Sequence, residues 1–384
     1  MTRLIITFSI VFALLFFDVY AQQLKVTLKE KFVIGDDENA PDEYLFAYPK
    51  HVNTDSENNI YIADLNMSKI RVFNQYGQFI KSIGRKGQGP GEMQEVMCMT
   101  IDHNDDLIVV DRMSRRFTRF SKMGEEFTTY PMPDNSFIDP WIILPLGLEL
   151  YALQYRVRED SKYYTNKESS LYNKKEDKLV HIYPIDFSSV LESFVSEDDI
   201  WDLSQPFFRA QIGRNSIKIA TLGNNAIVIA PWIYEGLLYL YQKVADQWQL
   251  KTLRGKIPTH KSYKMLNFSD YPDLKFPRGA YLLSGQSGKF AVRMQNMSRG
   301  LFAMNNGTIV HFSVTRSSEE EIIDGVELFE PDGTYIGYGQ FENHSMAMEV
   351  LWKDKDDRFY IRDSMGFSKI RVMSLEYQKI DEGK

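Results

Sequence analysis

The chain has 384 residues, a formal net charge of −7, and 43% hydrophobic residues. This hydrophobic content is ample for a large core, and the mildly acidic balance argues against nucleic acid as a partner. The single cysteine, Cys98, excludes an internal disulfide, and we expect it to be a small buried hydrophobe rather than a nucleophile.

The first 21 residues have the pattern of a secretory signal peptide. Arg3 precedes an apolar run from Leu4 to Phe17, and small residues lead to an expected cleavage site between Ala21 and Gln22. The alternative is a membrane anchor, but about 14 apolar residues are short for a bilayer span, which takes roughly 20. We therefore expect an exported protein, periplasmic or extracellular, with no integral membrane span after cleavage.

An internal repeat follows. Residues 48–84 align with residues 95–130 without a gap, which places Asp64 over Asp111, at a period of about 47 residues. In the first copy, turn residues separate four short apolar segments, which predicts strands over 50–54, 60–63, 69–74 and 79–83. Four antiparallel strands repeated at this spacing are typical of a β-propeller blade.

A third clear copy ends the chain. Residues 347–384 repeat the two aspartates as Asp354 and Asp363 but leave only a short polar segment for a fourth strand. Residues 24–35 near the other end resemble the fourth strand of the first copy. We predict that this N-terminal segment completes the last blade, because a ring closed in this way has no exposed sheet edge at the junction.

Between residues 130 and 347 the copies are degenerate. We expect a third blade over 141–157 that continues through 169–173 and 178–185, a fourth over 217–255 and a fifth over 300–341. The prediction is a single all-β domain, residues 22–384, folded as a six-bladed β-propeller of four-stranded antiparallel blades. Insertions at about 156–178, 187–208 and 256–281 leave little room for a seventh blade.

These repeats carry a family resemblance. With Asn59-Ile60-Tyr61-Ile62-Ala63-Asp64, Lys69-Ile70-Arg71-Val72-Phe73 and the linker Gly84-Arg85-Lys86-Gly87-Gln88-Gly89-Pro90-Gly91-Glu92, the chain resembles NHL-repeat six-bladed propellers, particularly the exported proteins of Bacteroidetes-like bacteria. The resemblance is specific in the first, second and last blades. It implies the fold, but such propellers include recognition scaffolds as well as metal-dependent lyases and lactonases, so it leaves the function open.

The glycine-rich linker at 84–92 admits two interpretations. A phosphate cradle needs a glycine turn between a strand and a helix, whereas this turn leads into a predicted strand and lacks the lysine and hydroxyl pair of a P-loop. We therefore interpret it as the joint between the first two blades. Its cations, Arg85 and Lys86, are not required by the turn, and we predict that they bind ligand on a propeller face.

Three aspartates, Asp64, Asp111 and Asp363, each end a second strand. A carboxylate at this position can accept N–H bonds from a neighbouring turn, and a ring of them could alternatively bind metal; we favour the structural role. Residues 102–106, DHNDD, begin like a calcium loop but lack its glycine and glutamate, so we expect a polar hairpin turn there.

The six histidines show no metal-ligand spacing. His51, on a predicted first strand, is the best candidate for a ligand on the propeller axis, although an ordinary packed histidine is the simpler interpretation. There is no nucleophile motif either. We therefore predict no catalytic residue, no metal ligand and no cofactor.

The insertions offer the strongest binding candidates. Trp201 lies in the second insertion, and Tyr263 and Tyr271 lie among prolines and cations in the third. Aromatic rings beside cations suit sugars or peptide segments, although they also pack loops onto a scaffold. The sequence thus predicts a monomeric binding or interaction module for a glycan or a partner protein. The alternative is a metal-dependent lyase or hydrolase with its site on the propeller axis.

Overall fold

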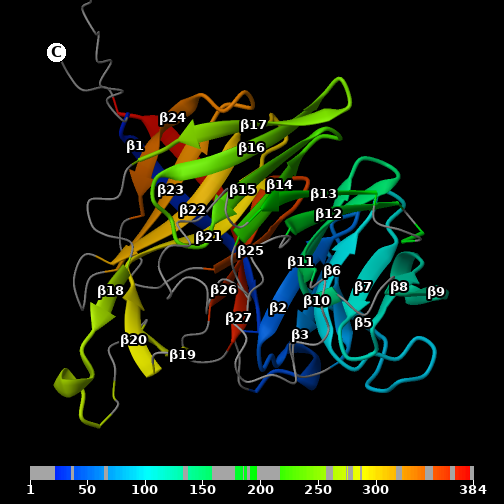
Figure 1. Cartoon of the computed structure of the whole chain (residues 1–384). Coiled ribbons are helices and arrows are strands. Elements are labelled where there is room, and N and C mark those ends of the chain that lie inside the picture. Colours follow the sequence, from blue (N-terminus) through cyan, green and yellow to red (C-terminus); the bar gives the residue numbers. More distant parts are fainter. Residues whose placement is uncertain are drawn as a thin grey trace, which may run out of the picture.

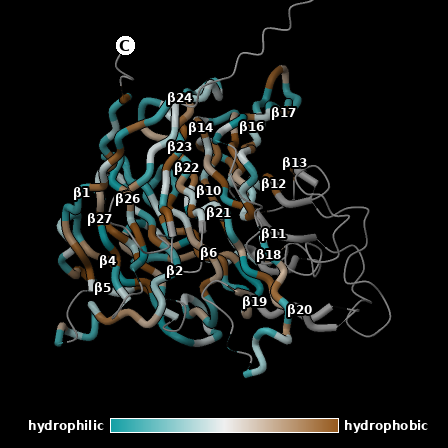
Figure 2. Tube along the Cα trace, turned by 90° about the vertical axis from the view of Figure 1, so that its left-hand side faces the viewer, coloured by the Kyte–Doolittle hydropathy of each residue, from teal (hydrophilic) through white to brown (hydrophobic). Residues whose placement is uncertain are grey.

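The computed structural model is a ring of six four-stranded antiparallel sheets with one additional three-stranded sheet (Figure 1). Apolar residues follow the strands, and polar residues gather in the connections (Figure 2). The structure describes residues 22–35, 39–64, 68–132, 137–157, 178–184, 186–187, 191–196, 217–256, 263–273, 275, 280–285, 288–316, 322–341, 349–363 and 368–380.

The first three blades follow one another along the chain. Blade 1 comprises β2 (Pro49–Thr54), β3 (Ile60–Asp64), β4 (Ile70–Phe73) and β5 (Phe79–Ile83). Blade 2 comprises β6 (Val96–Ile101), β7 (Leu107–Asp111), β8 (Arg116–Phe120) and β9 (Phe127–Pro131). Blade 3 comprises β10 (Phe137–Leu146), β11 (Leu150–Val157), β12 (Lys178–Pro184) and β13 (Glu192–Ser196). The strands predicted for blade 1 are confirmed to within one residue.

The last three blades complete the ring. Blade 4 comprises β14 (Ile217–Leu222), β15 (Ala226–Pro231), β16 (Leu237–Val244) and β17 (Gln247–Arg254). Blade 5 comprises β21 (Asn296–Ala303), β22 (Ile309–Arg316), β23 (Ile322–Phe329) and β24 (Tyr335–Gln340). Blade 6 comprises β25 (Glu349–Lys353), β26 (Arg358–Asp363), β27 (Lys369–Lys379) and the N-terminal strand β1 (Leu24–Ile34). The predicted six-bladed fold is confirmed.

The predicted closure of the ring is confirmed too. Strand β1 pairs antiparallel with β27, from Leu24 opposite Lys379 to Ile34 opposite Ile370. Its apolar residues alternate with polar ones, so that Leu24, Val26 and Leu28 are buried. This alternation is the period of a strand with one buried face.

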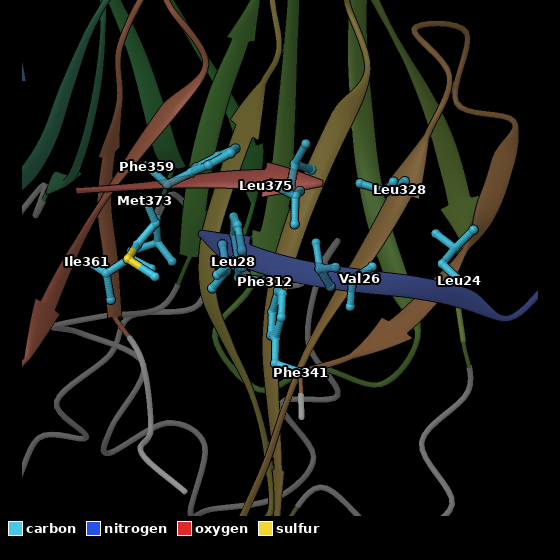
Figure 3. Packing of buried hydrophobic residues seen from close by; sticks show 13 residues of the cluster. Leu24, Val26, Leu28, Phe312, Leu328, Phe341, Phe359, Ile361, Met373 and Leu375 are labelled. Carbon is cyan, nitrogen blue, oxygen red and sulfur yellow. The ribbon is translucent and has the colours of Figure 1, made fainter. Parts of the chain in front are cut away.

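The buried face of β1 joins blade 6 to blade 5. Leu24, Val26 and Leu28 pack in one apolar cluster with Leu375 of β27 and Leu328 of β23 (Figure 3). The backbone takes part as well, because the Tyr338 N–H on β24 donates to the Gln22 carbonyl at 3.1 Å. The first described residues of the chain therefore bridge two blades.

Glycine makes this close approach possible. A Cβ atom added at Gly339 on β24 would lie 2.5 Å from Val26 Cγ1 and 2.8 Å from the Leu24 carbonyl oxygen. Such distances are shorter than van der Waals contact, so a side chain at this position would push β1 away from blade 5.

Two of the repeated aspartates fix the inter-blade linkers. The Asp64 carboxylate accepts N–H bonds from Ala47 at 2.7 Å and Tyr48 at 3.1 Å, just before the first strand of the same blade. Asp111 does the same for Gln94 at 2.8 Å and Glu95 at 3.1 Å. The predicted structural role is confirmed, and its main target is the linker rather than the turn after the strand.

Asp363 has side-chain partners among the described residues. Its carboxylate accepts a bond from Arg371 Nε at 2.9 Å, and Lys369 Nζ lies 4.0 Å away. The polar hairpin predicted at 102–106 is confirmed, because Asp102 Oδ1 accepts the N–H groups of Asn104 and Asp106. The aspartates thus stabilise linkers, turns and a strand pair by ordinary hydrogen bonds.

The propeller has two unlike faces. Blades are related by rotation about the ring axis, so their first strands run in the same direction. We call the face where these strands begin, and where the inter-blade linkers arrive, the linker face. The opposite face carries the turns between first and second strands, and we call it the turn face.

One element of the linker face was not predicted. Strands β18 (Tyr263–Leu266), β19 (Ala280–Gly285) and β20 (Gly288–Met294) form a three-stranded sheet in the order β18-β20-β19, set apart from the blades (Figure 1). It is inserted between the last strand of blade 4 and the first strand of blade 5. Residues 158–177 and 197–216, which hold most of the other two predicted insertions, lie outside the described residues.

Ring closure can be tested at Gly339. Replacing it with alanine should lower the free energy of unfolding by about 1–3 kcal/mol, the usual effect of forcing extra atoms into a packed site. Urea unfolding would measure this, with Lys25→Ala, an exposed position on β1, as the control. If both variants unfold at the urea concentration of the parent, the close approach of β1 to β24 is not needed.

Candidate functional site in the central channel

The described residues enclose a cavity of about 520 Å³ on the ring axis. Residues from the first strands of all six blades line it: β2, β6, β10, β14, β21 and β25. A cavity of this size lies within the range of small-ligand pockets. It is therefore the natural candidate site.

β-Bulges distort most of these first strands. One residue is left out of the pairing in blade 1, blade 2, blade 5 and blade 6, namely Lys50, Met97, Arg299 and Leu351, respectively. The pairing of β10 also shifts, between Ile138 and Ile142. Bulges redirect side chains and are frequent beside functional sites. Their presence in the channel wall therefore supports the cavity as a candidate site.

One carboxylate stands among cations at the linker end of the cavity. Glu349 lies 3.5 Å from Lys218 Nζ and also pairs with Arg362. Burial alone would raise the pKa of Glu349, but Lys218, Arg362 and Arg299 outweigh it and lower the pKa to about 2. The carboxylate is therefore ionised over the whole physiological range.

Lys50 is a cation without a carboxylate partner in the part of the chain that the structure describes. Its Nζ donates to the Met97 carbonyl at 3.2 Å and lies 4.4 Å from the centre of the Trp141 ring. The neighbouring Glu95 is already held by Arg112 at 2.9 Å. Burial accordingly lowers the pKa of Lys50.

Two polar atoms beside Lys50 are buried and unpartnered within the described chain, His51 Nε2 and Trp141 Nε1. The same is true of Arg299 Nε, near Glu349. Burial and the adjacent Lys50 lower the pKa of His51 well below its ordinary value, so the ring is neutral at physiological pH. Its hydrogen bond to the Met97 backbone favours a proton on Nδ1, because Nε2 has no partner. Nε2 is then a free acceptor, whereas Trp141 Nε1 is a free donor.

The turn end of the cavity is different, because its charges are paired. Lys353 Nζ lies 2.7 Å from Asp357. Asp102 is engaged by its own hairpin turn and accepts a bond from Tyr151 OH at 2.8 Å. Unused charge and hydrogen-bonding capacity are thus concentrated at the linker end.

The donors in this cavity do not fit a metal centre. Across the described residues, no three His, Cys, Asp or Glu side chains gather closely enough to hold a metal ion. His51 does line the cavity, as expected of the best axial candidate, but its neighbours there include the cation Lys50. Cys98 is buried as expected, and burial raises its pKa to about 12, so it remains a protonated thiol.

Arg85 and Lys86 lie in the joint between blades 1 and 2 and do not line the cavity. The Arg85 side chain is 82% exposed and pairs with Glu92 at 2.8 Å. The other oxygen of Glu92 accepts the Gly89 N–H at 2.8 Å, so the chain's own carboxylate occupies the glycine-rich loop. The predicted joint is confirmed; ligand binding by the two cations stays a prediction.

The aromatic candidates are separate from the channel lining. Tyr263 belongs to β18, and Tyr271 follows the short 3-10 helix η4 (Phe268–Asp270); both are half-buried. Trp201 lies outside the described residues. Sequence reasoning missed the residues that do line the linker end, apart from His51, because no local motif connects strands from different blades.

Blade 5 contains a second polar constellation, ordered like a catalytic triad. Ser298 Oγ lies 2.8 Å from His311 Nε2, and His311 Nδ1 lies 2.9 Å from Glu327 Oε2. None of the three is more than 1% exposed, and Ser298 Oγ also donates to the Pro231 carbonyl at 2.6 Å. Because a substrate cannot reach this serine, the constellation is structural.

Glu327 connects this buried network to the linker. Its Oε1 accepts the N–H of Lys256, which begins the segment leading to the three-stranded sheet. A Cβ atom added at Gly255 would lie 2.4 Å from the same oxygen. The carboxylate therefore fixes the point where the chain leaves blade 4.

The comparisons with known proteins agree with the fold. A family model described as DUF5128, a 6-bladed β-propeller, matches residues 39–139. A member of the DUF4221 family from Bacteroides vulgatus is 10% identical, with 94% of this chain and 100% of that chain covered and a TM-score of 0.57. A protein from Bacteroides fragilis that is described as exported is 12% identical, with 93% and 96% covered and a TM-score of 0.51.

A virginiamycin B lyase from Staphylococcus aureus is more loosely similar, at 11% identity and a TM-score of 0.41, with 91% of this chain and 99% of that chain covered. At such identities the solved structures show the fold alone. No curated protein matches the chain. Among the described residues, no helix is long and apolar enough to cross a membrane.

The buried network predicts a stability effect. Glu327→Ala should lower the free energy of unfolding by about 3 kcal/mol or more, because it leaves His311 and the Lys256 N–H without an acceptor. Urea unfolding measures this, with the exposed Glu330→Ala as the control. A variant as stable as the control would show that the network contributes nothing to folding.

The Glu349 cluster predicts a pH dependence. Because the folded pKa of about 2 lies below the ordinary value near 4.3, the carboxylate stabilises the fold above that ordinary value and ceases to do so as pH falls towards 2. Glu349→Gln mimics the protonated form. The parent should exceed this variant by about 3 kcal/mol at pH 7, and the difference should vanish near pH 2. A difference that does not change with pH would contradict the cation cluster.

Proposed function

We propose that this chain is an exported ligand-binding propeller that takes its ligand, a glycan or a partner protein, at the linker end of the central channel. The observation that carries the proposal is the cavity of about 520 Å³ with Lys50 and Lys218, the neutral His51 and Trp141 converging at one end. A pocket with a few convergent polar groups is the usual form of a binding site.

A binding role fits these groups better than catalysis. The histidine of the channel is neutral and the nearby carboxylate, Glu349, is held by cations, so neither is poised to move a proton near neutral pH. The metal-dependent lyase or hydrolase considered from the sequence has no donor cluster to support it among the described residues. We therefore keep a non-enzymatic role as the proposal.

The linker face also supports a role for the predicted rim residues. Tyr263 belongs to a sheet inserted between blades 4 and 5, and Arg85 and Lys86 belong to the linker between blades 1 and 2. We propose that these residues, together with Tyr271 and Trp201, extend the contact when the ligand is larger than the channel. Export is proposed from the N-terminal segment, and N-terminal sequencing of the mature protein, which should begin at Gln22, tests it.

The experiment is a glycan and pull-down screen followed by substitution. Trp141→Ala and Lys218→Met should weaken any ligand that the screen identifies at least tenfold, because both remove contacts at the channel mouth. Tyr263→Ala and Tyr271→Ala should weaken large ligands more than small ones. Isothermal titration calorimetry would measure each affinity.

The control is Tyr76→Ala, an aromatic that is 70% exposed in the turn after β4, on the opposite face. It should leave the affinity unchanged. A ligand that binds the two channel variants as tightly as the parent would place the site elsewhere and refute the proposal.

A further inference from the structure

We infer that the ligand of the channel is an acidic saccharide, whose carboxylate pairs with Lys50 and whose hydroxyl groups bond to His51 and Trp141. This inference rests on the proposed function and names its ligand class. It follows from charge, backbone geometry and unused hydrogen-bonding groups at the same place.

Charge is the first step. Two carboxylates lie near Lys50, and both are already engaged: Glu95 by Arg112, and Glu349 by Lys218 and Arg362. Within the described chain, Lys50 has no ion-pair partner. Burying a cation without a counter-ion is unfavourable. A ligand carboxylate beside Lys50 would therefore compensate for the desolvation free energy of this buried charge.

Backbone geometry is the second step. Lys50 and Arg299 are the residues left out of strand pairing by the bulges in β2 and β21. Neither bulge is needed to end a strand, since pairing resumes at His51 and Gly300. Bulges beside a cavity redirect side chains, and of the four residues that the bulges leave unpaired in the first strands, Lys50 is the cation that lines the cavity.

Unused hydrogen-bonding groups are the third step. His51 Nε2 is a buried acceptor and Trp141 Nε1 a buried donor, and neither has a partner in the described chain. An acceptor of this kind requires an O–H or N–H from the ligand, and a donor requires an oxygen. A hydroxyl group can serve as either, so a sugar carrying several hydroxyls complements both atoms.

Size and polarity are consistent with this class. A cavity of about 520 Å³ is within the range for a small ligand. Because Lys353 and Asp102 at the turn end are already paired, the anionic group of the ligand is directed to the linker end. An acidic peptide would also satisfy Lys50, but each backbone N–H serves only His51 and each carbonyl only Trp141, whereas a hydroxyl group serves either. The peptide is therefore a competing outcome in the test.

The test is isothermal titration calorimetry of the full mature chain with digalacturonate, with the neutral disaccharide digalactose and with a tetra-aspartate peptide. We expect digalacturonate to bind at least tenfold more tightly than either of the others. Lys50→Met, which keeps the side-chain length, should weaken digalacturonate at least tenfold and leave the neutral sugar unaffected. Trp141→Phe, which keeps an aromatic ring but removes the N–H, should weaken digalacturonate several-fold.

Two controls accompany these variants. Lys25→Met removes an exposed lysine on β1, outside the cavity, and should change nothing. Thermal melts show whether each variant is folded, and increasing salt should weaken digalacturonate binding to the parent because the pairing is ionic.

The inference is overturned if the parent binds digalactose or the peptide as tightly as digalacturonate, if it binds no acidic sugar, or if Lys50→Met binds digalacturonate like the parent. These failures are distinct from failure of the proposed function. A neutral glycan or protein whose binding is lost in Trp141→Ala would keep the channel site and refute only the acidic saccharide.

Discussion

The pairing of β1 with β27 is the contact on which the rest of the molecule depends. It joins the two ends of the described chain and buries Leu24, Val26 and Leu28 between blades 5 and 6. Without it, blade 6 would have three strands, and the outer edge of β27 would be unpaired. The channel exists only in the closed ring, because its wall takes one strand from every blade.

Closure also explains where polar groups are tolerated. The aspartates Asp64 and Asp111 hold the linkers that enter blades 1 and 2, so that the first strands begin at fixed positions around the axis. Buried networks such as Ser298, His311 and Glu327 are fully internal and serve the joint between blades 4 and 5. The linker end of the channel differs from both, because its donors and cations are not all satisfied by the residues that the structure describes.

The satisfied networks stabilise the fold, whereas the unsatisfied groups at the linker end are candidates for ligand binding. The chain as a whole is acidic, with a net charge of −7, so the cations on its axis do not reflect its overall composition. Burial lowers the pKa of Lys50, which means that the charged form of this lysine is disfavoured there without a counter-ion. At the turn end, by comparison, Lys353 has Asp357. The asymmetry is therefore a property of particular residues and not of the propeller as such.

The sequence predicted the architecture because the repeat encodes it. Aspartates and glycines mark the turns of blades 1, 2 and 6, and alternation in β1 showed that an N-terminal strand was available for closure. The sheet of β18, β19 and β20 was missed because its strands are short and separated by prolines and charges. In the channel, aligning the repeats puts Lys50 over Met97 but cannot show that both are bulged out of the pairing. His51 was singled out from its strand, whereas the contribution of Lys218, Trp141 and Glu349 depends on blades brought together only by the fold.

The central claim is that Lys50, at the linker end of the channel, binds an anionic group of the ligand, and a halide soak tests it most directly. Crystals soaked in sodium bromide and measured at the bromine absorption edge should give a strong anomalous peak inside the channel beside Lys50. Bromide bound only at exposed cations such as Arg85, with none in the channel, would contradict the account.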